Sequence, residues 1–75
     1  MAEISMEKLG SNIRRMREER GMSVEELAQK ACATVDYVNK AEAGKRVITL
    51  YAAMCFCDAL GVLPNDLLCG ITESN

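Results

Sequence analysis

The fold of this chain is decided by residues 21–46, GMSVEELAQKACATVDYVNKAEAGKR. Within this stretch Ser23 stands three residues before Glu26. At that spacing each side chain can accept a hydrogen bond from the other residue's backbone N–H at the start of a helix. Apolar residues then recur at helical spacing until a break at Cys32. Thr34 is a good N-terminal cap for another helix. The stretch therefore predicts two short helices joined by a tight turn.

Two short helices joined by so tight a turn must cross at a steep angle, and small residues let their backbones approach. Ala28 in the first helix and Ala41 in the second suit this contact, and Gly44 suits the end of the second helix. This is helix-turn-helix geometry, in which the second helix can enter the major groove of DNA. We place the motif at about residues 23–44 and its second helix at about 35–43.

Two flanking segments also predict helices. The first covers about residues 6–20, with Ser5 as its cap and a charged outer face that favours ion pairs such as Arg14–Glu18 and Arg15–Glu19. Its inward apolar stripe consists of Met6, Leu9, Ile13 and Met16. After the motif, Thr49 caps a fourth helix at about 50–60, and Pro64 suits the first turn of a short fifth helix.

The fourth helix is the segment for which we predict a second role, in dimer formation. We expect its inward side to consist of Leu50, Ala53, Met54, Cys57 and Leu60. The residues expected outside the core, where an exposed aromatic patch would serve as a dimer surface, are Tyr51, Cys55 and Phe56.

The spacing of Ala28, the turn at Cys32 and Val38, followed by EAGKR at 42–46, resembles the phage-repressor (Cro-like, XRE) family of helix-turn-helix DNA-binding domains. The resemblance runs without gaps over about residues 9–68. It implies an all-α fold, a compact five-helix repressor-like bundle. It also implies a repressor-like transcriptional regulator that reads double-stranded DNA as a homodimer, joined through the fourth and fifth helices.

By family position, the resemblance places the DNA contacts at the start and on the outward face of the second motif helix, and in the loop after it. Base reading would rest on Val35 through a thymine methyl group, Asp36 through a cytosine amino group and Asn39 through adenine. Anchoring to phosphates would come from Thr34, Tyr37, Lys40, Lys45 and Arg46.

Several of these residues also have a purely structural interpretation, and the sequence leaves both open. Asp36 complements the helix dipole in the first turn, as Lys45 and Arg46 do beyond the last turn. Tyr37 can pack beside its helix, and Asn39 can be a neutral exposed residue.

The resemblance further implies one structural ion pair and shows two departures from the family pattern. An arginine four residues before the glycine at position 21 pairs in the family with a glutamate, which here makes the pair Arg17–Glu42. Val24 stands where the family has a glutamine that bonds a phosphate. Cys32 stands where glycine is common because the backbone turns to positive φ, at a cost of about 1 kcal/mol for a cysteine.

The length of the chain indicates one small domain, residues 1–75 with a core at about 6–69. Its charge leads to a second hypothesis for its function. The chain has nine basic and eleven acidic residues, a net charge of −2, and all basic residues lie in the first 46 positions. Attraction to DNA would therefore be weak. The alternative is a protein-interaction module on the same fold, an antitoxin-like or adaptor subunit with little DNA affinity.

Other function classes are disfavoured by what the sequence lacks. There is no histidine and no Cys-x-x-Cys pair, so we expect no metal site, no cofactor and four reduced thiols: Cys32, Cys55, Cys57 and Cys69. Without a Cys–His pair or a glycine-rich phosphate loop, we expect no enzyme. No apolar run approaches the ~20 residues of a membrane span, and we expect a cytoplasmic protein with no membrane partner.

Overall fold

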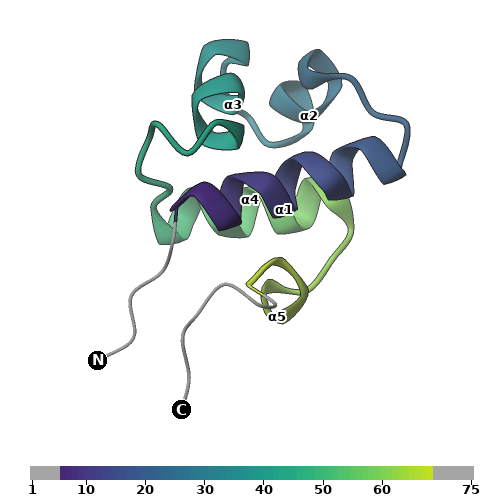
Figure 1. Cartoon of the computed structure of the whole chain (residues 1–75). Helices are drawn as coiled ribbons and strands as arrows, with labels where there is room; N and C mark the ends of the chain where they lie inside the picture. The colour runs from purple at the N-terminus through teal and green to yellow at the C-terminus, as the bar shows by residue number, and fades with distance from the viewer. Residues whose placement is uncertain (1–5, 69–75) are drawn as a thin grey trace.

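The computed structural model describes residues 6–68, and these form an all-helical domain of five helices. They are α1 (Met6–Glu19), α2 (Val24–Lys30), α3 (Val35–Glu42), α4 (Leu50–Leu60) and α5 (Pro64–Leu67). Figure 1 shows α2 and α3 over one side of the layer formed by α1 and α4, with α5 on the other side. The all-α prediction is confirmed; the predicted cap Ser5 and the thiol of Cys69 lie outside the described residues.

The helices of the motif begin at the predicted caps. The Glu26 backbone N–H donates to Ser23 Oγ at 3.0 Å, and the Ser23 N–H donates to Glu26 Oε1 at 3.0 Å, which completes the capping box of α2. At the start of α3 the Tyr37 N–H donates to Thr34 Oγ1 at 3.0 Å. Thr49 caps α4 in the same way. These side chains satisfy backbone donors that have no partner inside a helix.

The turn between α2 and α3 contains the strained residue that the sequence predicts. Cys32 has φ 55°, and among the described residues other than glycine no other φ is positive. The next residue's N–H, that of Ala33, donates to the Ala28 carbonyl at 2.8 Å and so closes the end of α2. A left-handed residue here lets the chain reverse within a few positions and bring α3 across α2.

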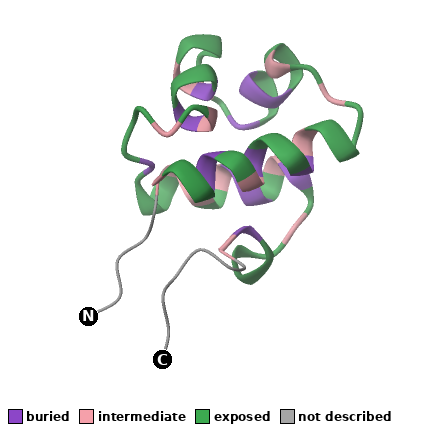
Figure 2. Cartoon of the chain, viewed as in Figure 1, coloured by how far each residue is buried: buried purple, intermediate pink, exposed green. Residues whose placement is uncertain are grey.

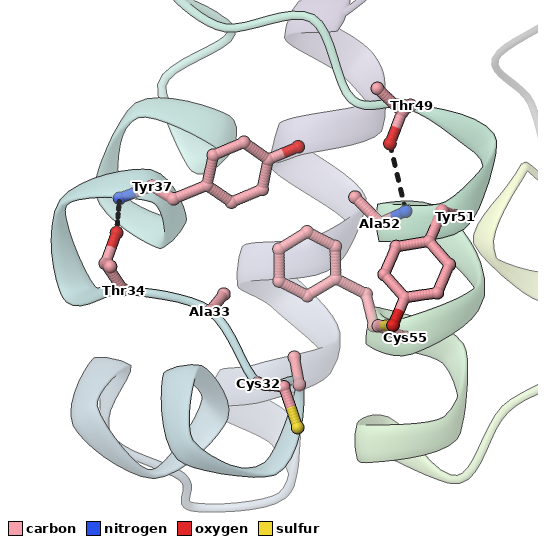
Figure 3. A pocket seen from close by; sticks show the side chains of 10 residues that line it. Cys32, Ala33, Thr34, Tyr37, Thr49, Tyr51, Ala52 and Cys55 are labelled. Atoms are coloured by element: carbon pink, nitrogen blue, oxygen red, sulfur yellow. Dashed lines mark hydrogen bonds between the residues drawn. The ribbon is translucent and has the colours of Figure 1, made fainter.

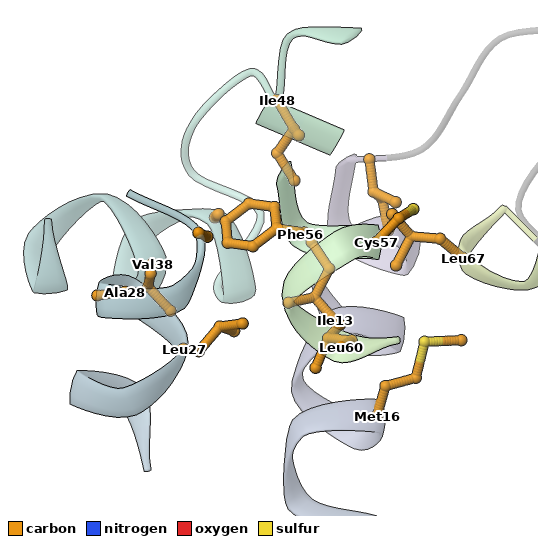
Figure 4. Close-up of a cluster of buried hydrophobic side chains, with 13 residues drawn as sticks. Ile13, Met16, Leu27, Ala28, Val38, Ile48, Phe56, Cys57, Leu60 and Leu67 are labelled. Atoms are coloured by element: carbon orange, nitrogen blue, oxygen red, sulfur yellow. The ribbon is translucent and has the colours of Figure 1, made fainter. Parts of the chain in front are cut away.

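Each helix contributes one of the five largest fully buried side chains to a single core (Figure 4). From α1 to α5 these side chains are Ile13, Leu27, Val38, Phe56 and Leu67. Burial of one such side chain stabilises a fold by roughly 1.5–3 kcal/mol. In Figure 2 the buried positions of α1, α2 and α3 face one another across the interior of the domain. Asn12 on α1 also donates from Nδ2 to the Leu67 carbonyl at 3.0 Å, which holds the single turn of α5 in place.

The contact between α1 and α3 depends on Gly10. A Cβ at this position would meet the Ala41 carbonyl and lie 2.8 Å from the carbonyl oxygen of Glu42, well inside van der Waals contact. The absence of a side chain therefore lets α1 approach the backbone at the end of α3.

The predicted orientation of α4 is wrong at three residues. Phe56, expected outside the core, is 1% exposed, whereas Leu50 and Met54, expected inside, are 79% and 56% exposed. Of the other inward predictions, Cys57 and Leu60 are buried and Ala53 is half-buried. Of the other outward predictions, Tyr51 is exposed and Cys55 is half-buried.

The reason for the error lies in the composition of α4. Its only charged residue is Asp58, so the sequence offers almost no polar face that would fix the rotation of the helix. Phe56 turns inward because its ring fills the space beside α3, where it stacks on Tyr37 with ring centres 6.2 Å apart. Burial of the large aromatic ring of Phe56 stabilises the domain more than burial of Met54 in its place would.

Candidate nucleic-acid interface

The α3 helix has one buried side and one exposed side, and the exposed side carries four of the eight residues predicted to contact DNA. Val38 and Ala41 are buried, which fixes the rotation of the helix. The exposed residues lie at positions i, i+1, i+4 and i+5 and share one face. We call this the recognition face, and its members are Val35, Asp36, Asn39 and Lys40.

Lys40 and Asp36 already pair on the recognition face. Lys40 Nζ lies 3.1 Å from Asp36 Oδ2, at the i,i+4 spacing, and both side chains are exposed. Exposed pairs of this kind contribute about 0–1 kcal/mol, so a phosphate could draw Lys40 away at little cost. The pair nevertheless leaves the recognition face without net charge.

Tyr37 does not lie on the recognition face. It is half-buried, and in Figure 3 its ring points away from α3 toward α4. Its hydroxyl donates to the Val47 carbonyl at 3.5 Å, a long bond, and its ring stacks on Phe56. The guanidinium of Arg46 lies over the same ring, with Cζ 5.2 Å from the ring centre, a cation–π contact. Of the two interpretations left open by the sequence, this geometry favours packing.

Thr34, Lys45 and Arg46 flank the recognition face at the two ends of α3. Thr34 is exposed, and its oxygen is already used as the cap of α3. Lys45 and Arg46 are exposed in the loop after Gly44, and the Lys45 N–H donates to the Lys40 carbonyl at 2.9 Å. Positive charge at this place complements the C-terminal end of the helix.

An ion pair fixes α3 against α1, and it is the pair that the resemblance implies. Arg17 Nε lies 2.7 Å from Glu42 Oε2, and Arg17 Nη2 donates to Glu42 Oε1 at 3.1 Å. The third donor, Nη1, bonds the Met22 carbonyl at 2.8 Å. The side chains are only 12% and 8% exposed, and the hydrogen bond to Glu42 raises the pKa of Arg17. This bidentate pair sets the orientation of the recognition face.

Residues 8–68 match the family model of the helix-turn-helix domain. The chain belongs to the helix-turn-helix domain family. Among curated proteins, none is similar enough in sequence to count as a match. The family is the kind that the resemblance of residues 9–68 predicted.

Solved structures resemble this helix-turn-helix domain along most of its length. The restriction-modification controller protein C.AhdI from Aeromonas hydrophila has 31% identity, with 83% of this chain and 94% of that chain covered and a TM-score of 0.81. The clp gene regulator ClgR from C. glutamicum has 27% identity, 88% and 86% coverage, and a TM-score of 0.83. The hypothetical transcription factor NHTF from Neisseria has 33% identity, 85% and 74% coverage, and a TM-score of 0.81.

The start of α2 differs from what the family resemblance implies for a phosphate contact. Val24 is half-buried and packs against the core of this helix-turn-helix domain, so an apolar contact replaces the amide. Glu25 and Glu26 beside it are exposed and acidic. This end of the motif is therefore a weaker candidate for phosphate binding than the loop that follows α3.

The described part of this helix-turn-helix domain meets neither the requirements of a metal site nor those of a membrane-spanning helix. No group of three or more His, Cys, Asp or Glu side chains within residues 6–68 could hold a metal ion. None of the helices in that range is long and apolar enough to cross a membrane.

One feature of this domain was missed by sequence reasoning: a hollow of about 370 Å³ between the α2–α3 turn and α4 (Figure 3). The turn contributes Cys32 and Ala33, and α4 contributes Tyr51, Ala52 and Cys55. The two groups are about twenty positions apart in the sequence, so no local pattern brings them together. The inward rotation of Phe56, which the sequence did not fix, also shapes this hollow.

Proposed function

We propose that this protein regulates transcription by binding DNA as a homodimer, with α3 of each copy in one of two successive major grooves. The observation that carries the proposal is the recognition face. It is exposed and polar while the opposite side of α3 is buried, and the Arg17–Glu42 pair holds it at a fixed orientation. A rigid helix with exposed polar side chains suits the reading of base edges.

The proposed contacts divide into base reading and anchoring. Val35, Asp36 and Asn39 would read bases from the recognition face, whose geometry presents them together. Thr34, Lys40, Lys45 and Arg46 would meet phosphates from around it. Tyr37 acts indirectly in this proposal, because its ring positions the guanidinium of Arg46.

The proposed dimer uses the outer side of α4 together with α5. Leu50, Tyr51 and Met54 are large, exposed and on one face of α4, and Leu63 is exposed just before α5. Clusters of exposed apolar side chains in small domains mark interaction surfaces. In this fold the dimer would space two recognition faces about 34 Å apart, one turn of DNA.

Two further points support a regulatory role. The structurally similar proteins named above include a restriction-modification controller protein and a gene regulator. The sequence has no histidine, so it cannot form a Cys–His or Ser–His catalytic pair, and a small helical domain of this kind suits binding better than catalysis. We therefore propose a regulator and not an enzyme.

A second candidate function is a protein-interaction module with little DNA affinity. The specific observation in its favour is the neutral recognition face, where Asp36 pairs with Lys40 on a chain of net charge −2. In this reading the apolar side of α4 would meet a different protein and α3 would remain solvated.

Fluorescence anisotropy with fragments of the surrounding genome, over a salt series, tests the first proposal. We expect one fragment to bind more tightly than random DNA, with affinity falling steeply as salt rises from about 50 mM. Lys40→Glu and Lys45→Glu together should abolish binding. Arg14→Glu with Arg15→Glu, the same total change of charge on the exposed face of α1, is the control and should leave most of the affinity. Absence of binding even at low salt would support the protein-interaction module.

A further inference from the structure

The hollow between the α2–α3 turn and α4 has apolar walls and is large enough for a ligand. Aromatic rings of Tyr37, Tyr51 and Phe56 line it, together with small alanine side chains such as Ala33 and Ala52. Its volume of about 370 Å³ is within the range of pockets that hold small organic molecules, roughly 300–1,000 Å³. Flat rings in the walls favour a flat, apolar guest.

The polar groups of the hollow favour a guest that accepts hydrogen bonds. Thr34 and Thr49 line it, and each hydroxyl oxygen already accepts a backbone N–H as a helix cap. Each hydroxyl proton therefore remains available to donate. None of the described residues that line the hollow is a carboxylate, lysine or arginine, so nothing in it would neutralise a charged guest. A neutral molecule with carbonyl oxygens at its edge fits this pattern.

Two thiols line the same hollow. Cys32 is exposed at the turn, and Cys55 is half-buried on α4; both are free. The Tyr51 hydroxyl lies against the Cys55 sulfur in Figure 3, and this hydrogen bond raises the pKa of Tyr51. The phenol thus keeps its proton and can donate a hydrogen bond to the Cys55 sulfur. Cys57 lies two residues after Cys55 on α4. It is buried in the core and lines no part of the hollow.

We propose that this hollow is a capture site for small, flat, carbonyl-bearing electrophiles of the quinone class, with Cys55 as the nucleophile that bonds them. The walls would hold the ring system and the threonine hydroxyls would donate to its carbonyl oxygens. Capture depends on the hollow as well as on the thiol. Cys32 also lines the hollow but is exposed at the turn, whereas Cys55 is half-buried on α4, so we assign the bond to Cys55.

The chemical step needs no additional oxidant or reductant. The Cys55 thiolate adds to a ring carbon conjugated with a carbonyl, which forms a C–S bond and moves the π electron pair to the carbonyl oxygen. That oxygen takes up one proton, equal to the one the thiol has lost. The hydrogen on the attacked carbon then moves to the second oxygen, so the product is a hydroquinone thioether.

Bonding of a guest at Cys55 would also affect the residues proposed to bind DNA, and this consequence rests on the proposed function. Thr34 caps α3, and Tyr37 supports Arg46, and both residues line the hollow. A guest bonded between α4 and these residues would displace the start of α3 and the loop after it. We therefore expect the adduct to bind DNA more weakly than the free protein.

The test compares two electrophiles on the full chain carrying Cys69→Ser. 1,4-Naphthoquinone has the proposed shape, and iodoacetamide is a small polar probe of general thiol reactivity. The rate of each reaction at each cysteine is followed by peptide mass spectrometry at neutral pH. The key variant, Ala52→Met, fills the hollow and keeps both thiols. Ala43→Met, the same substitution at an exposed alanine outside the lining, is its matched control.

We expect naphthoquinone to modify Cys55 first, and Cys55→Ser to abolish that fast adduct while Cys32→Ser leaves it. In Ala52→Met the ratio of naphthoquinone to iodoacetamide rates at Cys55 should fall about tenfold, equivalent to ~1.4 kcal/mol of lost binding. Ala43→Met should leave that ratio unchanged. Equal modification of Cys32 and Cys55, or a ratio that Ala52→Met does not change, would overturn the capture site.

DNA affinity is measured on the same samples by anisotropy. Weaker binding after modification of the wild type, but not of Cys55→Ser, supports the regulatory consequence. Unchanged affinity of a fully modified protein overturns that consequence alone. If the unmodified protein binds no DNA, the proposed function fails, while the mass measurement still decides the capture site.

Discussion

The helices α3 and α4 are built on the same plan but present opposite chemistry to their surroundings. Each packs one side on the core, α3 through Val38 and α4 through Phe56. The outer side of α3 is polar, with Asn39 and Lys40, whereas the outer side of α4 is apolar, with Leu50 and Met54. A polar exposed helix suits a hydrated partner such as DNA, and an apolar one suits another protein surface.

The two helices also differ in what holds them. A buried bidentate ion pair ties the end of α3 to α1, while α4 is held in its rotation mainly by the packing of Phe56, Cys57 and Leu60. Directional bonds fix orientation, and apolar packing supplies most of the stability. Variants of each helix can therefore separate the loss of stability from the loss of orientation.

The largest effect should come from the packed side of α4. Phe56→Ala should lower the free energy of unfolding by about 3–5 kcal/mol, because it leaves a cavity beside Tyr37. Met54→Ala, on the outer side of the same helix, should change it by less than about 0.5 kcal/mol. Urea unfolding followed by circular dichroism measures both. A larger loss of unfolding free energy for Met54→Ala than for Phe56→Ala would contradict the orientation of α4 described above.

Removal of the ion pair should have the next largest effect. Arg17→Ala leaves the Glu42 carboxylate buried without its partner and should cost about 3 kcal/mol in a urea titration. The double variant Arg17→Met with Glu42→Leu removes both charges and should recover much of that stability. Because it also removes the directional bonds, it should still bind DNA more weakly than the wild type. A double variant no more stable than Arg17→Ala would contradict the role of the unpaired charge.

The alkaline side of the stability profile should reflect Cys57. Burial, with a smaller effect of Asp66, raises the pKa of this thiol above its ordinary value. The contribution of the protonated Cys57 thiol to the free energy of unfolding is fully present below its unfolded-state pKa of about 8.5. It is lost as the pH rises from there through its pKa in the folded state. Unfolding midpoints measured from neutral to alkaline pH should fall less steeply in Cys57→Ala. An unchanged slope would mean that other groups dominate this range.

The smallest effect belongs to the turn between α2 and α3. Cys32→Gly should raise stability by less than about 1 kcal/mol, since glycine adopts the φ of 55° without steric cost but loses more entropy on folding. Cys32→Ala keeps the steric cost and should give no gain, so it is the matched control. Equal stability of the two variants in thermal unfolding would contradict strain at this position.

The motif could be predicted from sequence in detail because local chemistry marks its limits. The capping box of Ser23 and Glu26 and the cap Thr34 each act within a few residues of chain. The left-handed conformation of Cys32 was implied by the family resemblance. The pair Arg17–Glu42 lies 25 positions apart and came from family resemblance alone. Local signals thus account for the elements, and resemblance accounts for this long-range contact.

The inward stripe of α1 was predicted correctly, with Leu9, Ile13 and Met16 buried, but side-chain directions on α4 could not be predicted in the same way. On α4 an almost entirely apolar sequence fits several rotations, and only the space beside α3 decides that Phe56 turns inward. The same choice turns Tyr37 away from the recognition face and shapes the hollow that holds Cys55. These features depend on packing between distant segments, which no single stretch of sequence contains.

The central claim is that the recognition face of α3 reads base sequence, and selection of bound DNA from a random pool tests it most directly. The wild type should enrich a two-fold symmetric site with half-sites about 10 base pairs apart. Asn39→Ala should enrich the same site with the preference relaxed at one base pair in each half. Enrichment of no recurring sequence, or an identical preference from Asn39→Ala and Val35→Ala, would contradict the claim.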